Sequence, residues 1–185
     1  MDDERALVAR MRQGDAAALQ RLVTAYHRPL FAFLFRLTDD SALADDLAQE
    51  TFIRMIAQRG RPPDSVRSWA FTVARNLAYD YFRSAVYKRE QATDFDVSED
   101  DRADNDWNTP EEAMIEADQH VAIADQLQGL PPEQREVVIL RFYHDLPLAE
   151  IAEVTAAPLG TVKSRLFHAL KKLKSEMVVR GFAHE

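Results

Sequence analysis

The sequence predicts an all-α fold in which two small helical domains are joined by a flexible acidic linker. Apolar residues recur at helical spacing through residues 4–89, where strand-like alternation is absent. The next stretch, 90–108, combines mutually repelling carboxylates with little apolar mass, as is typical of a linker. Beyond it, prolines and glycines divide the chain into short helices. We therefore expect domains over residues 1–89 and 110–185, with the linker at 90–109.

The first domain is expected to contain four helical segments. The first runs from residue 4 to Val23 with a break near Gly14-Asp15, and the second runs from about Tyr26 to Leu37. The run Thr38-Asp39-Asp40-Ser41 combines a stop with a cap, so a third helix should extend from Ser41 to about Ala57. Its apolar side would carry Leu43, Leu47, Ala48, Phe52, Met55 and Ile56.

A loop is predicted at Gln58–Asp64, because Gly60 and the pair Pro62-Pro63 cannot continue a helix. Ser65 can then cap a fourth helix, which should reach about Tyr87. The buried stripe expected on this helix consists of Trp69, Val73, Ala74, Leu77, Tyr81 and Phe82.

Polar residues at positions i, i+4, i+8 and i+11 share one face of the fourth helix, namely Thr72, Asn76, Asp80 and Arg83. With Arg75 and Tyr79 beside it, this face can hydrogen-bond bases, contact phosphates and stack a base on a ring. The preceding loop could hold an extruded base against Arg59, Arg61 and Ser65. From the spacing alone, a solvated polar face is the favoured interpretation.

The third helix should expose an acidic surface formed by Asp45, Asp46, Gln49 and Glu50, with Arg54 at its end. Carboxylates repel DNA, so this surface suits a protein partner with basic residues. On charge alone, ordinary solvated carboxylates are the favoured interpretation.

The second domain is expected to begin with a capping box. Thr109 and Glu112 have the required spacing and Pro110 suits the first turn, so a helix should run to about Gln128. Gly129 and the prolines after it break this helix. Further helices are predicted over Pro132–Tyr143, Pro147–Thr155 and Gly160–Val179. The first of these should bury Val137, Val138, Ile139 and Leu140.

The last two helices, joined by a turn at 155–159, form a predicted helix-turn-helix. Its second helix should face the core with Val162, Leu166, Ala169, Leu170 and Leu173. The side left for solvent or DNA carries Thr161, Lys163, Ser164, Arg165, Phe167, His168, Lys171 and Lys172. Such a helix can enter the major groove, where Arg165 suits guanine and the hydroxyls and later lysines suit phosphates. An ordinary basic amphipathic helix is the alternative, which the paired helix and its turn disfavour. Taken alone, His168 is interpreted as a surface residue.

The net charge of -8 conceals two basic stretches. Residues 61–89 and 159–185 each hold 6 basic and 2 acidic side chains, whereas residues 90–118 hold 1 and 12. The acidic total therefore does not argue against DNA binding. Cysteine is absent, which excludes disulfides and thiol catalysis and suits a cytosolic protein. Neither a secretory signal nor a membrane span is expected.

Three segments resemble the extracytoplasmic-function sigma factors of bacterial RNA polymerase. Asp45–Phe52, DDLAQETF, looks like the polymerase-binding signature of that family. Trp69–Ala78, WAFTVARNLA, looks like the promoter-melting segment, and Leu130–Val137 with the helix-turn-helix looks like the second conserved domain. The segments occur in the family's order, and the resemblance covers nearly the whole chain outside 90–108.

The resemblance implies a specificity subunit that directs core polymerase to promoters. Docking on the coiled coil of the beta-prime subunit would involve Asp45, Asp46, Gln49 and Glu50, and the beta flap is a further contact. Recognition and opening of the minus-10 element would involve Arg61, Ser65, Thr72, Asn76, Asp80 and Arg83. Reading of the minus-35 element would involve Thr161, Lys163, Ser164, Arg165, Phe167, His168 and Lys171. The linker would thread toward the active-site and RNA-exit channels of the polymerase. The resemblance also implies control by an anti-sigma factor, a role in a stress response and a cytoplasmic location.

Two departures from the family pattern are expected to matter. Ala156 stands where family turns often carry glycine, and a positive φ there would cost roughly 1 kcal/mol. His168 stands where several relatives carry arginine, so the minus-35 preference cannot be copied from a relative.

Two other classes of protein were weighed against a sigma factor. A repressor or activator using the same helix-turn-helix should carry a dimer element or ligand domain in place of residues 41–87, and the sequence shows neither. An enzyme is disfavoured because the five histidines lack metal spacing and no phosphate loop or nucleophile motif is present. We therefore expect no catalytic residues, no metal and no cofactor.

Overall fold

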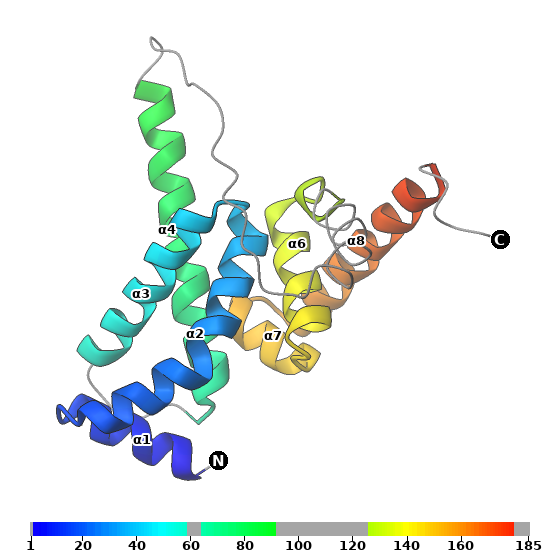
Figure 1. Ribbon diagram of the computed structural model, residues 1–185. Helices are drawn as coiled ribbons and strands as arrows, with labels where there is room; N and C mark the ends of the chain where they lie inside the picture. Colours follow the sequence, from blue (N-terminus) through cyan, green and yellow to red (C-terminus); the bar gives the residue numbers. More distant parts are fainter. Residues whose placement is uncertain (1, 59–63, 92–125, 180–185) are drawn as a thin grey trace, which may run out of the picture. The chain divides into compact units, whose positions relative to one another are not determined.

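The computed structural model describes residues 2–58, 64–91 and 126–179 (Figure 1). Every regular element in these ranges is a helix, which confirms the predicted all-α class. The predicted linker lies outside the described residues apart from its first two positions. The predicted domain boundaries therefore stay predictions.

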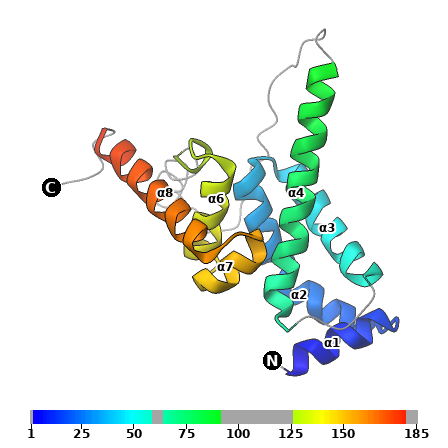
Figure 2. The ribbon, with the colours of Figure 1, turned by 180° about the vertical axis from the view of Figure 1, so that it is seen from behind.

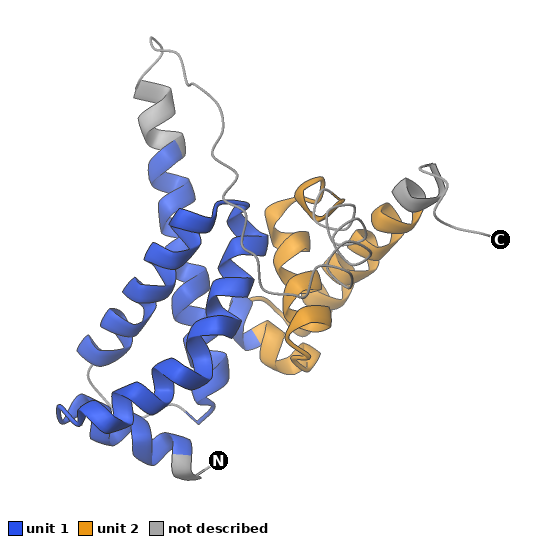
Figure 3. Ribbon diagram, in the orientation of Figure 1, with its two compact units in different colours: residues 1–102, 153–156 blue, residues 103–152, 157–185 orange. Residues whose placement is uncertain are grey.

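The chain divides into two compact units, which Figure 3 shows in different colours. One unit comprises residues 1–102 with 153–156, and the other comprises residues 103–152 with 157–185. Among the described helices of both units, none is long and apolar enough to cross a lipid bilayer.

Four helices build the first unit, namely α1 (Asp2–Arg12), α2 (Ala16–Thr38), α3 (Ser41–Ala57) and α4 (Val66–Gln91). Figure 2 shows α4 along its length, packed beside α2 and α3. In the core, the rings of Phe33 from α2 and Phe71 from α4 meet edge to face, with centroids 5.4 Å apart. Such a pair contributes about 0.5–1.5 kcal/mol beyond the burial of its area.

Side chains cap three of these helices. The carboxylate of Asp15 accepts from the backbone N–H groups of Ala17 and Ala18, at 3.0 and 3.1 Å, and so begins α2. The Ala18 N–H and the guanidinium of Arg10 hold the pKa of the Asp15 carboxyl below its usual value. Asp40 caps α3, and the hydroxyl of Ser65 caps α4 as predicted.

The predicted start of the second helix at Tyr26 is wrong, because α2 begins at Ala16 and is continuous to Thr38. Pro29 lies inside it, in the first turn of the helix that was predicted to begin at Tyr26. Its buried face continues past this proline through Tyr26, Leu30 and Phe33. Packing of that face against α1, α3 and α4 outweighs the one backbone hydrogen bond that proline removes.

The buried stripe of α4 differs from the predicted one. Trp69 and Val73 are only half-buried and Tyr81 is exposed, whereas Ala74 and Leu77 are buried as expected. The stripe instead contains Val66, Ala70, Phe71, Ala74, Leu77 and Ala78. Its alanines let α4 lie close to its neighbours, which moves the larger rings to the edge of the contact. There the indole N–H of Trp69 donates to the side-chain oxygen of Gln58 at 2.7 Å.

The described part of the second unit contains α6 (Pro132–Val138), the π-helical turn η1 (Ile139–Tyr143), α8 (Leu159–Val179) and α7 (Leu148–Thr155) up to residue 152. Together α6 and η1 occupy the range of one predicted helix, and the four predicted apolar residues in it are buried. The helix predicted from Pro110 lies outside the described residues except for 126–128, which are helical. Arg135 donates to the carbonyls of Leu127, Gln128 and Leu130 and so satisfies the end of that helix.

The turn between α7 and α8 closes with a Schellman motif. The N–H of Ala157 donates to the carbonyl of Ala152 at 3.1 Å, and the N–H of Ala156 donates to that of Glu153 at 3.2 Å. Ala156 has a φ of 50°, in the left-handed region. The strain predicted for an alanine at this position is therefore present, and the predicted helix-turn-helix is confirmed.

Candidate nucleic-acid and protein interfaces

One face of α8 presents the polar and basic residues that the sequence assigns to DNA. Lys163, Ser164, His168 and Lys171 are exposed, and Thr161 is half-buried in the first turn. Phe167 is 64% exposed, and its ring meets that of His168 edge to face with centroids 5.5 Å apart. A large apolar ring exposed among cations can contact thymine methyl groups or base edges in the major groove.

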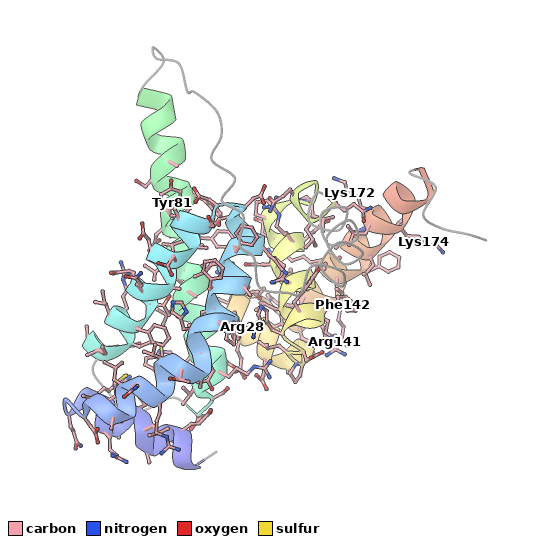
Figure 4. All side chains as sticks on the ribbon, viewed as in Figure 1. Arg28, Tyr81, Arg141, Phe142, Lys172 and Lys174 are labelled. Carbon is pink, nitrogen blue, oxygen red and sulfur yellow. The ribbon has the colours of Figure 1, made fainter. Side chains whose placement is uncertain are left out.

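Two residues of α8 differ from the predicted pattern. Leu170 was placed in the core but is 41% exposed, whereas Val162 and Ala169 are buried as expected. Arg165 was placed on the DNA side, but its guanidinium Nη1 lies 3.8 Å from the carboxylate of the buried Glu136 on α6. Lys172 of α8 is labelled in Figure 4. Its ammonium donates to the carbonyl of Gly129, which connects α8 to the turn that precedes α6.

The acidic surface of α3 is present as predicted. Asp46 and Gln49 are exposed, and the amide of Gln49 donates to the carboxylate of Asp45 at 2.7 Å. Glu50 accepts from Arg54 on the next turn at 3.0 Å. His27 from α2 brings its Nε2 to 3.6 Å from the other oxygen of Asp45.

Apolar side chains extend this acidic surface along α3, and sequence reasoning placed one of them wrongly. Ile56 was expected in the core but is 39% exposed, and Ile53 on the same part of the helix is 58% exposed. An acidic surface with adjoining aliphatic side chains suits a protein partner better than it suits DNA, because apolar area adds binding energy there. The sequence indicates this apolar face through Ile53, which does not share the helical spacing of the core-facing residues of α3.

Some residues on the polar face of α4 form hydrogen bonds within the helix or at its cap. The hydroxyl of Ser65 accepts from the Ser68 N–H at the helix cap, and that of Thr72 donates to the Ser68 carbonyl at 2.8 Å. Asn76 is exposed, and Asp80 accepts from Arg83 within the helix. Arg61 and the rest of the predicted base-holding loop, 59–63, lie outside the described residues.

A groove between α3 and α4 brings together residues that the sequence assigned to separate surfaces. Its volume is about 520 Å³, and its lining includes Glu50 from the acidic surface and Asn76 from the polar face. Ile53, Arg54, Ala57, Gln58 and Val73 complete the lining. No sequence pattern predicts this groove, because it depends on how the two helices cross.

The described residues hold no cluster of three or more histidine, aspartate or glutamate side chains that could bind a metal ion. The exposed face of α8 is basic and polar. The exposed surface of α3 is acidic with adjoining aliphatic side chains.

Comparison with known proteins assigns a family model to each unit. A model described as Sigma-70 region 2 matches residues 22–86, and a model described as Sigma-70, region 4 matches residues 120–173. The first match includes the acidic surface of α3 and the polar face of α4. The second includes the helix-turn-helix.

Curated relatives match most of the chain. The ECF RNA polymerase sigma factor SigL of Mycobacterium tuberculosis is 34% identical over 166 residues, covering 86% of this chain and 89% of the relative. The RNA polymerase sigma-H factor of Pseudomonas aeruginosa is 30% identical over 177 residues, covering 91% and 90%. The ECF RNA polymerase sigma factor BldN of Streptomyces coelicolor is 32% identical over 172 residues, and this chain spans only 63% of its length.

Two solved structures share the fold. The sigma factor RpoE from Bartonella quintana, crystallised with the anti-sigma factor NepR, aligns with a TM-score of 0.67 and 21% identity, covering 86% of this chain and 96% of that one. CnrH, solved with the cytosolic domain of CnrY, aligns with a TM-score of 0.70 and 21% identity, covering 95% and 97%. At this level of identity the likeness concerns the fold alone.

Proposed function

The chain belongs to the extracytoplasmic-function sigma factors of bacterial RNA polymerase, and we propose that it directs core polymerase to a specific set of promoters and opens them. The observation that carries this proposal is the order of its two matched regions, each with its own exposed surface. One unit offers an acidic face for a protein, and the other offers a basic helix for DNA. The chain acts as a specificity subunit without catalysis of its own.

The exposed face of α8 reads the minus-35 element in this proposal. Lys163 and Lys171 supply phosphate contacts, which position the helix on the duplex. Ser164, Phe167 and His168 face the base edges, with Thr161 at the N-terminal end of the helix. Because an imidazole ring lacks the planar fork of N–H donors that a guanidinium presents, His168 favours a different base preference from relatives with arginine.

The acidic surface of α3 binds core polymerase in this proposal. Its carboxylates at Asp45, Asp46 and Glu50 attract a basic partner surface, here assigned to the coiled coil of the beta-prime subunit, and Gln49 adds a hydrogen-bonding amide. The neighbouring isoleucines supply apolar contact area. A further contact with the beta flap is assigned to the second unit.

The polar face of α4 binds the non-template strand of the minus-10 element. Asn76 lines the groove beside α3, where its amide can pair with the edge of an unstacked base. Asp80 and Arg83 continue the same face along the helix, where Arg83 donates to Asp80 and can contact a DNA phosphate. Thr72 and Ser65 act mainly by holding the local backbone, and Arg61 belongs to the predicted loop.

An anti-sigma factor is proposed as a further partner. The sigma factor RpoE of Bartonella quintana was crystallised with the anti-sigma factor NepR, and CnrH was solved with the cytosolic domain of CnrY. We extend that mode of control to this chain, together with a stress-responsive role and a cytoplasmic location. Affinity purification of the tagged chain from unstressed cells should recover a stoichiometric inhibitory protein, and recovery of core polymerase alone would argue against this control.

Run-off transcription tests the proposed function. Core polymerase is mixed with a library of genomic fragments, with and without the full chain, and the 5′ ends of the transcripts are sequenced. We expect transcripts that depend on the chain and share one promoter motif. A regulator of another class would bind DNA without giving core polymerase any new start sites.

A further inference from the structure

We propose that Glu136 on α6 and Arg165 on α8 form a positioning pair, which fixes the orientation of α8 so that its exposed face meets the minus-35 element. Arg165 then acts on DNA recognition through the fold, as a positioning residue, and reading of bases falls to its exposed neighbours. This inference rests on the proposed minus-35 function and assigns two residues within it.

The helical period places Arg165 toward α6. Val162 and Ala169 are both fully buried, and Arg165 lies three residues after the first and four before the second. Residues with these spacings share one face of a helix. Lys163, Ser164 and Phe167 fall on the exposed side instead.

The burial of the two side chains supports a role inside the unit. The side chain of Glu136 is 0% exposed and that of Arg165 is 27% exposed. A carboxylate removed from water is tolerated in a fold when cations or hydrogen-bond donors compensate its charge. The guanidinium Nη1 of Arg165 lies 3.8 Å from the Glu136 carboxylate, close enough to provide that compensation across the packed contact of α6 and α8.

The same geometry disfavours a base-reading role for Arg165. An arginine that reads guanine places two parallel N–H groups on the base edge, and its fork must point away from its own protein. Here Nη1 points to the buried carboxylate of α6. The side chains of Lys163 and His168 are exposed instead, so they can approach the major groove of DNA.

A pair of this kind predicts an asymmetry among variants. Replacing Arg165 alone removes one of the groups that compensate the buried Glu136 charge, so α8 shifts or the unit loosens. Replacing both residues by neutral side chains removes the charge as well as its partner, and such replacements of buried ion pairs are often tolerated. A residue that touches DNA directly would behave differently, because changing Glu136 cannot restore a lost contact between Arg165 and a base.

The experiment compares Arg165→Met, Glu136→Gln and the double variant with the wild-type chain, each as the full chain bound to core polymerase. Promoter fragments with a randomised minus-35 element are bound and the retained sequences are read. Affinity is then measured on the fragment most enriched by the wild type. Lys163→Met is the matched control, since it removes an exposed cation of the same helix. Thermal unfolding of each free chain is recorded in parallel.

We expect Arg165→Met to lose at least about tenfold in promoter affinity and to melt at a lower temperature. The double variant should recover affinity to within about threefold, with the wild-type base preferences and a restored melting temperature. Lys163→Met should lose affinity with unchanged melting. The inference is overturned if the double variant binds as weakly as Arg165→Met, if it has lost a preference at a single base pair, or if Arg165→Met binds and melts like the wild type. A wild-type chain that enriches no minus-35 sequence would refute the proposed function instead, and the melting temperatures would still decide the pair.

Discussion

Replacing Ala156 by glycine should stabilise the helix-turn-helix formed by α7 and α8. Ala156 occupies the left-handed position of the Schellman turn with a φ of 50°, and its methyl group is exposed. A left-handed conformation costs a non-glycine residue about 1–2 kcal/mol, whereas glycine brings back about 0.5–1 kcal/mol of backbone entropy. The exposed methyl group buries no apolar area that could be lost. The net gain should be about 0.5–1 kcal/mol, which raises the melting temperature of a unit of this size by a few degrees.

Amide hydrogen exchange of peptides from α7 and α8 reports this effect on the helix-turn-helix in the full chain. Ala157→Gly is the matched control, because Ala157 follows in the same turn without a positive φ and should lose stability on gaining backbone freedom. The reasoning would be refuted if Ala156→Gly exchanged as fast as the wild type or faster. Equal stabilisation by both glycines would also contradict it, since the relief of strain is confined to Ala156.

Three further variants test the first unit. Glu50→Lys should reduce affinity for core polymerase at least about tenfold, because it reverses a charge on the acidic surface of α3. The loss of the exposed pair between Glu50 and Arg54 should cost less than about 0.5 kcal/mol of stability. Co-purification with core polymerase measures the affinity, with Glu153→Lys as the control, and normal co-purification of Glu50→Lys would exclude Glu50 from the interface. Asp15→Asn should make stability fall less steeply at acid pH. The folded state holds the pKa of the Asp15 carboxyl below its usual value of 3.8, so the ionised carboxylate stabilises the fold above pH 3.8 and this contribution is lost as pH falls through the folded pKa. If the melting temperatures of the wild type and the variant fell in parallel between pH 6 and pH 2, the role of the Asp15 carboxylate in capping α2 would be contradicted. Tyr26→Phe should lose about 1 kcal/mol at neutral pH, since the Tyr26 hydroxyl donates to Glu4 at 2.9 Å. Burial and that hydrogen bond raise the pKa of Tyr26, so the wild type but not the variant should lose stability as pH rises above about 10, and identical alkaline unfolding of the two would contradict this account.

Local chemistry made the helix boundaries predictable where caps and breakers are strong. Gly14 with Asp15 separates α1 from α2, and Ser65 begins α4, because these residues satisfy or interrupt backbone hydrogen bonds by themselves. The left-handed turn at Ala156 was expected from the family resemblance alone, because family turns often carry glycine there. Pro29 does not end α2, because a proline inside a helix is tolerated when the rest of its face is packed.

Tertiary packing determines which side chains are buried where local sequence patterns do not predict it. Small residues bring α4 close to α2 and α3, so Trp69 and Tyr81 lie at the edge of a contact that their size suggested they would fill. The groove that joins Glu50 to Asn76 arises only where two helices cross. Arg165 is the clearest case, since its charge suggested DNA whereas its place in the helical period and the buried Glu136 turn it toward α6.

The opening of promoter DNA tests the central claim most directly. Permanganate modifies thymines that have lost their base partners, so it reports the melted minus-10 region of a promoter found by run-off transcription. We predict reactive thymines upstream of the start site when core polymerase and the full chain are both present, and none with either alone. Thymines that stay protected with both present, or that react equally with core polymerase alone, would contradict the account.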